Sequence, residues 1–331
     1  MATQAEAFSP KEFTCWIKAE ATVGTSVLAT SGMSQLDVDS VGYPSLNVSQ
    51  ALDVRSGKGR TFKDEDFFQD NKMRVVELTL AGTMHNDTGH KLLLKNICNY
   101  DGVSDIPIPT GGSASSQLYG ASVANDTSSL TVVIAASDHS NQKSLEFPGM
   151  VVTSFALSSD NGTEGGRYKF SATLQSGKVP DLAEASVAAG GTLYGNTDTA
   201  FLSSSSGHLV FAKDVIMNSF TCTIESPAVF AGATSSGYNL VSRGAETAVT
   251  VDTQVKWDSE TMGFVNSFDT QTAALSGDMF EVINNNAFGI TIENGVFTSV
   301  AFSEGDIMML DCSIKSVDDG TDALVTFDVT S

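Results

Sequence analysis

The sequence predicts a mainly β protein in which one domain occurs twice in tandem, with one α-helix in each copy. Three short segments recur in the same order: 13–17 (FTCWI) as 220–224 (FTCTI), 76–80 (VELTL) as 248–251 (AVTV), and 151–158 (VVTSFALS) as 296–303 (VFTSVAFS). The offset falls from 207 residues between Phe13 and Phe220 to 145 between Val151 and Val296, so the first copy has the longer connections. With 29 Gly and only 7 Pro in 331 residues, the composition is typical of short strands joined by turns.

The strands are predicted from alternation of apolar and polar residues, which is the pattern of a half-buried antiparallel strand. Two strands follow it closely, with these polar residues on the outer face: Glu77, Thr79 and Thr83 in the first copy, and Thr250, Asp252 and Gln254 in the second. Near the C-terminus, Leu310, Cys312 and Ile314 alternate in the same way. The turn at 318–321 (DDGT) then predicts a terminal hairpin with 323–329.

Each copy is expected to hold one helix directly after its alternating strand. Asp87 or Thr88 can cap a helix over 90–100, and Asp258 or Ser259 can cap a helix over 260–268. The apolar stripes are Leu93, Leu94, Ile97 and Cys98 in the first helix, and Phe264, Val265 and Phe268 in the second.

The domain boundaries follow from the repeats and from composition. The first copy spans 1–178, with long loops at 31–70 and 101–128. A linker rich in Gly, Ser and Ala covers 179–207, and the second copy spans 208–331. The segment 31–70 has no counterpart of similar length in the second copy and is the main candidate for an insertion.

The net charge of −21 is unevenly distributed. Residues 1–180 hold 14 Lys and Arg against 19 Asp and Glu (−5), and residues 181–331 hold 4 against 20 (−16). Such a chain does not bind nucleic acid by neutralising phosphates, which requires clustered Lys and Arg. It suits a surface that must not adhere to DNA, or an acidic soluble protein from a saline habitat.

One loop departs from the acidic balance, with Arg55, Lys58, Arg60 and Lys63 close together. It lacks the spacing of a phosphate-binding loop. Two interpretations stay open: contact with the acidic surface of a neighbouring subunit, or a solvated loop.

No catalytic, cofactor or metal site is predicted. The four cysteines and four histidines have no ligand spacing, and reduced, buried cysteines are expected. The acidic turns at 160–164 and 318–322 are interpreted as hairpin turns, with Ca²⁺ binding as the alternative. No run of 18 apolar residues and no signal peptide are visible, so we expect a protein that works where it is made.

At the repeated segments the chain resembles the major tail tube proteins of long-tailed, siphovirus-like bacteriophages. The resemblance rests on these segments: 147–158 and 162–167 in the first copy, and 220–227, 241–246, 264–273, 303–306 and 317–325 in the second. It covers most of 215–331 and about a third of the first copy. None of these segments is diagnostic by itself, and no enzymatic residue comes with them.

The resemblance implies a β-sandwich flanked by a helix in each domain. In this family the inner sheets of six domains join into a β-barrel channel, and the rings stack into a tube. Two domains per chain would then give a trimer with pseudo-six-fold symmetry, in place of a simple homohexamer. The six polar residues of the two alternating strands would belong to the inner sheet, around an acidic lumen through which DNA slides without specific binding.

The resemblance also implies a non-enzymatic virion protein, assembled in the host cytoplasm without contact with a membrane. Its partners would be other copies of itself, a tape-measure protein, and tail terminator and distal tail proteins. The first alternative is a receptor- or carbohydrate-binding β-sandwich module, although only 2 Trp and 6 Tyr are present to form sugar platforms. The second is a hydrolase with a β-sandwich core, because folding could bring carboxylates together.

Overall fold

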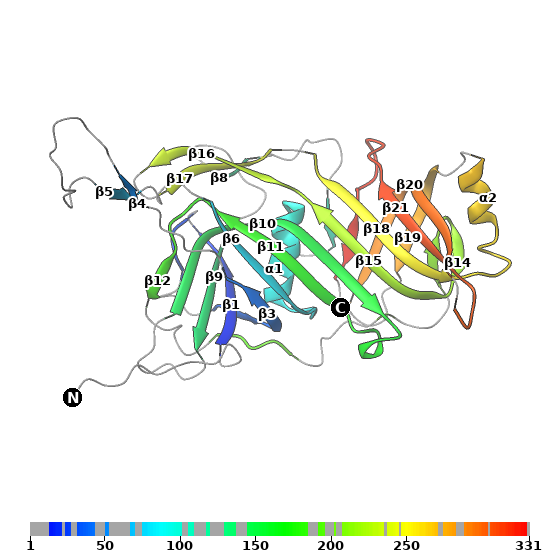
Figure 1. Cartoon of the computed structure of the whole chain (residues 1–331), viewed down its shortest axis with the longest axis horizontal. Coiled ribbons are helices and arrows are strands. Elements are labelled where there is room, and N and C mark those ends of the chain that lie inside the picture. Colours follow the sequence, from blue (N-terminus) through cyan, green and yellow to red (C-terminus); the bar gives the residue numbers. More distant parts are fainter. Residues whose placement is uncertain are drawn as a thin grey trace.

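The computed structural model describes the chain in the following ranges: 13–21, 24–27, 32–43, 50–52, 67–69, 75–100, 105–108, 117–119, 129–136, 144–184, 191–195, 202, 207–234, 237–244, 246–270, 274–282, 288–303 and 305–329. Within them the protein is mainly β, as predicted, with two α-helices and one 3₁₀ turn (Figure 1). Every strand pair is antiparallel, apart from an isolated parallel bridge between Ser34 and Thr192.

The elements in chain order are β1 Phe13–Ala19, β2 Ser34–Leu36, β3 Val38–Gly42, β4 Gln50–Leu52, β5 Phe67–Gln69, β6 Val76–Thr83, α1 Thr88–Cys98, β7 Ile106–Pro107, β8 Gln117–Tyr119, β9 Leu130–Ala136, β10 Ser144–Asp160, the 3₁₀ turn Glu164–Gly166, β11 Lys169–Ser176, β12 Asp181–Glu184, β13 His208–Val210, β14 Lys213–Val215, β15 Met217–Glu225, β16 Ala228–Thr234, β17 Gly237–Arg243, β18 Ala248–Lys256, α2 Gly263–Asp269, β19 Ala274–Val282, β20 Gly289–Ser303, β21 Met309–Ser316 and β22 Thr326–Asp328.

Eight of these strands form one long sheet that runs across the molecule (Figure 1). Their order is β3-β6-β11-β10-β15-β18-β21-β20. Along the six inner strands, residues that point to one side are mostly buried and residues that point to the other are mostly exposed or partly buried, as in β18, where Val249, Val251 and Val255 are buried. The alternation predicted for β6 and β18 is thereby confirmed.

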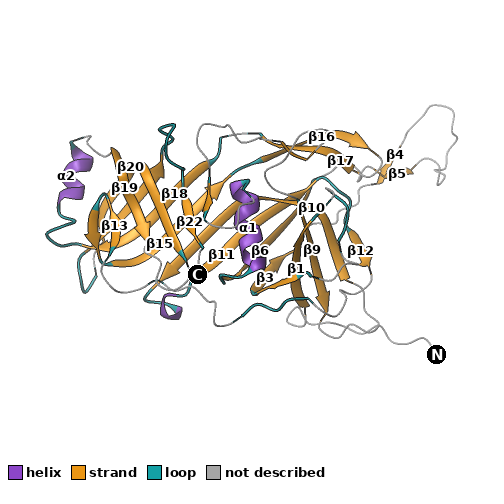
Figure 2. Cartoon of the chain, turned by 180° about the vertical axis from the view of Figure 1, so that it is seen from behind, coloured by secondary structure: helices purple, strands orange, loops and turns teal. Residues whose placement is uncertain are grey.

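The two longest strands, β10 and β20, each belong to two layers. The first half of β10 pairs with β9 and β12, and β9 also pairs with β1. The first half of β20 pairs with β19 and β22, and β19 also pairs with β13. These second layers pack behind the long sheet, with α1 on the same side (Figure 2), and one apolar core runs through both halves of the chain.

The pairing scheme of residues 13–184 occurs again in residues 208–329. We name β1, β3, β6, α1, β9, β10, β11 and β12 the N-terminal unit, and β13, β15, β18, α2, β19, β20, β21 and β22 the C-terminal unit. Six strand pairs recur at the same positions in the two units. In the N-terminal unit they are β1–β9, β3–β6, β6–β11, β10–β11, β9–β10 and β10–β12. In the C-terminal unit they are β13–β19, β15–β18, β18–β21, β20–β21, β19–β20 and β20–β22.

Two irregularities also recur at matching positions. The register shifts at Thr153 in β10 and at Thr298 in β20, and each threonine Oγ1 donates to a carbonyl of the facing strand at 3.2 Å. The register shifts again at Asp39 in β3 and at Asn218 in β15. A bulge is specific to its place in a sheet, so these matches align the two units residue by residue.

This alignment shows that the first sequence match was wrong. β1, which holds residues 13–17, pairs with β2 and β9 behind the long sheet, whereas β15, which holds 220–224, lies within the sheet. The strand that occupies the place of β15 in the N-terminal unit is β3, because β3 pairs with β6 as β15 pairs with β18. Part of 31–70 is therefore a matched strand and no insertion.

Helix α1 begins and packs nearly as predicted. Asp87 caps it, with Oδ1 accepting a hydrogen bond from the His90 backbone N at 2.9 Å, and Leu93, Leu94 and Ile97 are buried. The chain leaves the helix at Asn99, whose φ of 53° is left-handed.

Helix α2 is shorter than predicted and starts at Gly263. The Asp258 carboxylate accepts from the backbone N of Glu260 at 3.0 Å and of Thr261 at 3.4 Å, so it stabilises a turn that precedes the helix. Phe264 is buried, but Phe268 is 37% exposed, so the predicted apolar stripe was only partly correct.

The prediction of a terminal hairpin was also wrong. β22 pairs with the first half of β20 and with β7, not with β21. The chain crosses between layers after β21, since the Val317 backbone N donates to the Asn294 carbonyl at 3.0 Å and the Leu324 N donates to the Ile108 carbonyl at 3.1 Å. The loop predicted over 101–128 thus supplies β7 to the C-terminal unit, and β8 pairs with β17.

The four cysteines are buried and free, as expected from the sequence. Burial raises the pKa of Cys15, Cys222 and Cys312 to about 12, with Asp311 adding to the effect on Cys312, and burial also raises the pKa of Cys98. Only a thiolate reacts with disulfide reagents, and a rise of three pKa units lowers the thiolate fraction at pH 8 by about a thousandfold.

We therefore expect no thiol to react with a disulfide reagent in the native protein within minutes, and all four to react in denaturant. The course of reaction, followed by absorbance, measures this directly. A thiol that reacts rapidly in the native protein would contradict the burial of that cysteine.

Candidate assembly surface

The long sheet presents one continuous polar face to solvent. We call this surface the polar face and define it by the following residues, which lie opposite one another across the strands: Ser40 and Gly42 (β3), Glu77, Thr79, Ala81 and Thr83 (β6), Lys169, Ser171, Thr173 and Gln175 (β11), Ser154, Ala156, Ser158 and Asp160 (β10), Ser219, Thr221, Thr223 and Glu225 (β15), Thr250, Asp252, Gln254 and Lys256 (β18), Asp311, Ser313 and Lys315 (β21), and Ser299, Ala301 and Ser303 (β20). Half of these residues are Ser or Thr, whose side chains are short and carry a hydroxyl group. The face is therefore hydrophilic.

The charges of this face are predominantly negative. Its carboxylates are Glu77, Asp160, Glu225, Asp252 and Asp311, against Lys169, Lys256 and Lys315.

Four of the five carboxylates accept hydrogen bonds from neutral side chains. The donor–acceptor pairs are Gln175 Nε2 to Glu77 at 2.9 Å, Ser154 Oγ to Glu225 at 2.8 Å, Ser313 Oγ to Asp252 at 2.6 Å and Gln254 Nε2 to Asp311 at 2.8 Å. Amide and hydroxyl donors fix a carboxylate without cancelling its charge. The orientation of these groups is thus set while the face stays acidic.

The predicted inner-sheet residues all lie on this face. Glu77, Thr79, Thr250 and Asp252 are exposed, and Gln254 is partly buried. Thr83 shares the face but is only 6% exposed, because Lys169 Nζ donates to its Oγ1 at 3.0 Å while also pairing with Asp39 at 2.9 Å.

The predicted contact residues Arg55, Lys58, Arg60 and Lys63 lie outside the described residues. The predicted inner sheet contained only β6 and β18, and it left out the contributions of β3, β10, β11, β15, β20 and β21 to the face, although the alternation of β21 was predicted. The alternation of Lys169, Ser171, Thr173 and Gln175 with apolar residues was a signal that could have found β11.

The two units join where β10 pairs with β15. Seven consecutive residues pair, from Ser154 opposite Glu225 to Asp160 opposite Ser219. Behind these pairs Phe155, Leu157, Phe220 and Cys222 are fully buried. The rings of Tyr168 and Phe220 meet edge to face across the junction, with centroids 5.3 Å apart.

A buried arginine fixes this junction from behind. Arg243, at the end of β17, donates from Nη1 to the carbonyls of Val152 at 2.7 Å and Ser226 at 2.6 Å, and from Nη2 to the carbonyl of Asn96 at 2.8 Å. Burial lowers its pKa to about 10, so it stays charged at neutral pH. It connects α1 and the β10 bulge of one unit to the end of β15 in the other.

In both acidic turns a carboxylate accepts a hydrogen bond from a nearby backbone N, but only the turn at 160–164 joins two strands that pair with each other, β10 and β11. Asp160 Oδ1 accepts from the Gly162 N at 2.6 Å, and Asp318 Oδ1 accepts from the Gly320 N at 2.8 Å. Within the described ranges, no three His, Cys, Asp or Glu side chains are placed to hold a metal ion together. A search of the same ranges finds no helix of the length and apolar character that a membrane crossing needs.

Neither the protein-family models nor the curated proteins with which the chain was compared give a match.

Proposed function

We propose that this protein is a structural subunit of a tail tube of the siphovirus-like type, which polymerises into stacked rings around a DNA channel. The single observation that carries this proposal is the long sheet, to which two units contribute four strands each through the β10–β15 pairing. A sheet that passes from one unit to the next in this way would serve as a segment of a larger barrel wall.

The two units are, in this proposal, tandem copies of one tube domain. The support is the same six strand pairs in the same chain order, together with two bulges at matching positions. The described strands of the two copies span 13–184 and 208–329, so the first copy extends beyond the boundary at 178 that the sequence predicted, because β12 pairs with β10. In addition, β7 and β8 of the first copy pair with strands of the second.

A chain with two such units occupies two adjacent positions of a ring. Three chains would then make a ring of six units, with pseudo-six-fold symmetry. The β10–β15 junction inside each chain would alternate with an equivalent junction between chains. Closure of the ring removes the two free sheet edges that a single chain exposes.

The polar face would line the lumen of this ring. Its short hydroxyl side chains give little for DNA to contact, and its excess of carboxylates repels phosphates. DNA would pass without specific binding. In the virion tail, assembled in the host cytoplasm, the tube would enclose a tape-measure protein and end at tail terminator and distal tail proteins.

The purified chain, concentrated alone, tests this function. Negative-stain electron microscopy should show rings or stacked tubes with a central channel. A chain that remains monomeric at high concentration would refute the proposal and favour the receptor- or carbohydrate-binding alternative.

A further inference from the structure

We propose that the end of β20 in one chain meets the end of β3 in the next chain as an antiparallel pair, in the register that β10 and β15 use within the chain. The inference rests on the proposed ring assembly and specifies its contact: the partner is a second copy of this chain, Phe302 lies opposite Tyr43, and Ser303 lies opposite Gly42.

The two edges are both open on their outer side. Among the described strands, β3 pairs with β6 alone, and residues 297–303 of β20 pair with β21 alone. They lie at opposite ends of the long sheet. Two different open edges on one molecule can join head to tail, and such a contact closes into a ring when the rotation between copies permits it.

The internal β10–β15 junction shows which side chains of the β20 edge would be buried by a neighbouring strand. The alignment of the units places Val300 and Phe302 of β20 at the positions of Phe155 and Leu157 of β10, which are fully buried. Phe302, however, is 50% exposed and Val300 is only partly buried. Phe302 contacts the ring of Trp257, with centroids 5.9 Å apart, but among the described strands none covers Val300 and Phe302 as β15 covers Phe155 and Leu157.

The β3 edge also exposes a side chain whose counterpart at the internal junction is buried. Ser40 pairs with Ala81 beside the β3 bulge, as Ser219 pairs with Gln254 beside the β15 bulge. Three residues further along, Tyr43 corresponds to Cys222, which is fully buried at the internal junction. Tyr43 itself is 45% exposed. Large apolar groups in these positions on both edges indicate a partner that covers them.

The register follows from the internal pairs. Leu157 faces Cys222, and Ser158 faces Thr221. Transferred to the open edges, Phe302 faces Tyr43 and Ser303 faces Gly42. The two most exposed aromatic side chains of these edges are thus directly opposite each other, where cross-strand aromatic pairs stabilise a sheet.

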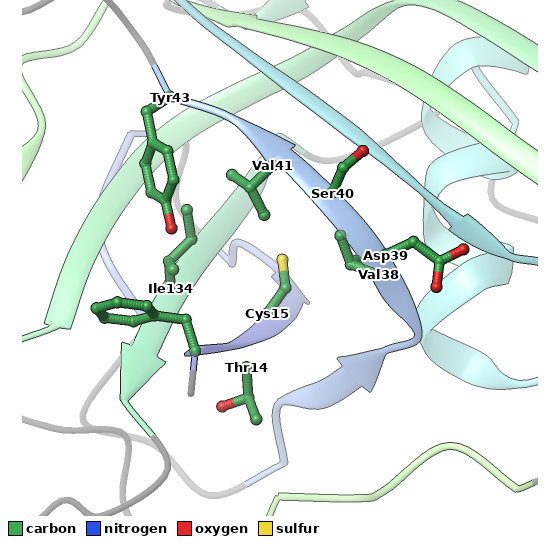
Figure 3. A pocket seen from close by; sticks show the side chains of 9 residues that line it. Thr14, Cys15, Val38, Asp39, Ser40, Val41, Tyr43 and Ile134 are labelled. Atoms are coloured by element: carbon green, nitrogen blue, oxygen red, sulfur yellow. The ribbon is translucent and has the colours of Figure 1, made fainter. Parts of the chain in front are cut away.

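The β3 edge is also shaped to receive side chains. A hollow of about 530 Å³ lies beside it, between β3 and β1. Figure 3 shows Tyr43, Val41, Cys15 and Ile134 around this hollow, and Thr14, Asp39 and Ser40 also line it. The lining thus combines apolar and polar side chains, with an apolar part beside Tyr43 that suits Phe302.

Engineered disulfides test the register. Directly opposite residues of an antiparallel pair bring their Cβ atoms close enough for a disulfide. The variant Tyr43→Cys/Phe302→Cys should, on oxidation, give a ladder of one, two and three linked chains on a non-reducing gel. The matched control Tyr43→Cys/Val317→Cys places the second thiol at a side chain of similar exposure, 45%, outside the junction and should stay monomeric on the gel.

Tyr43→Lys provides an independent test that needs no cross-link. Because Tyr43 is half-exposed in the single chain, the variant should fold as the wild type does by circular dichroism. Ring association should weaken by about tenfold or more, since a lysine would be buried opposite Phe302. Val317→Lys should assemble normally.

The outcomes separate the two proposals. Rings that form without the Tyr43–Phe302 cross-link, or that tolerate Tyr43→Lys, would overturn this junction and leave the tube function standing. Failure of the wild-type chain to form any ring would overturn both.

Discussion

Arg243→Met is expected to lower the free energy of unfolding by about 2–4 kcal/mol, because three carbonyls in two units lose a charged donor. These carbonyls belong to Asn96, Val152 and Ser226. Methionine fills similar space without donating, so the change isolates the hydrogen bonds from packing. Urea unfolding followed by tryptophan fluorescence measures the effect.

Two variants make this result specific. Arg243→Lys should lose most of the stabilisation that Arg243→Met loses, because an ammonium group cannot replace the planar guanidinium that reaches three carbonyls. Arg167→Met, at an exposed arginine, should change stability by less than about 0.5 kcal/mol. Equal behaviour of Arg243→Met and Arg167→Met would show that Arg243 does not fix the junction.

Tubes assembled from the variant Glu77→Lys/Asp252→Lys are expected to retain DNA that wild-type tubes release. The two carboxylates lie on the polar face, one in each unit, and both residues are exposed in the single chain. Their reversal should give the lumen clustered cations, and binding through phosphates should weaken steeply as salt rises. Co-sedimentation of short labelled duplex DNA with the tubes, at low and high salt, measures retention.

The control variant must add the same charge elsewhere. Glu260→Lys/Asp269→Lys changes two exposed carboxylates beside and at the end of α2, away from the polar face. If the polar face lines the lumen, Glu260→Lys/Asp269→Lys tubes should resemble the wild type inside and retain far less DNA. Equal retention by both variants would place the polar face outside the channel.

The sequence predicted those parts of the fold that are determined by residues near one another in the chain. The alternation in β6 and β18 and the cap at Asp87 are set by residues near in sequence, and both were found in the structure. The helix over 260–268 was misplaced by three residues because Asp258 caps a turn as readily as a helix.

Pairing partners could not be predicted in the same way. Residues 13–17 and 220–224 read alike because both are half-buried strands, yet β1 and β15 belong to different layers. A strong turn signal precedes β22 and predicted its pairing with β21, but β22 pairs with β20 and β7. Such partners depend on contacts distant in sequence, which alternation does not encode.

The candidate site was predicted only in part for the same reason. Six polar residues of β6 and β18 were assigned to one face correctly, since alternation determines the face of a strand. The contacts of Arg243 could not be predicted, because its three carbonyl acceptors lie in segments distant in sequence. The proposed contact between Tyr43 and Phe302 was found only after the two units had been aligned by their bulges. Neither is visible from residue type and spacing.

The most direct test of the account is the number of chains in one assembled ring, measured by native mass spectrometry of rings held below tube-forming concentration. Two ring positions per chain predict a mass of three chains, or 104.1 kDa from three times 34.7 kDa. Electron microscopy of the same sample should show six similar units around the channel. A ring of six chains would contradict the account, because each chain would then supply only one position.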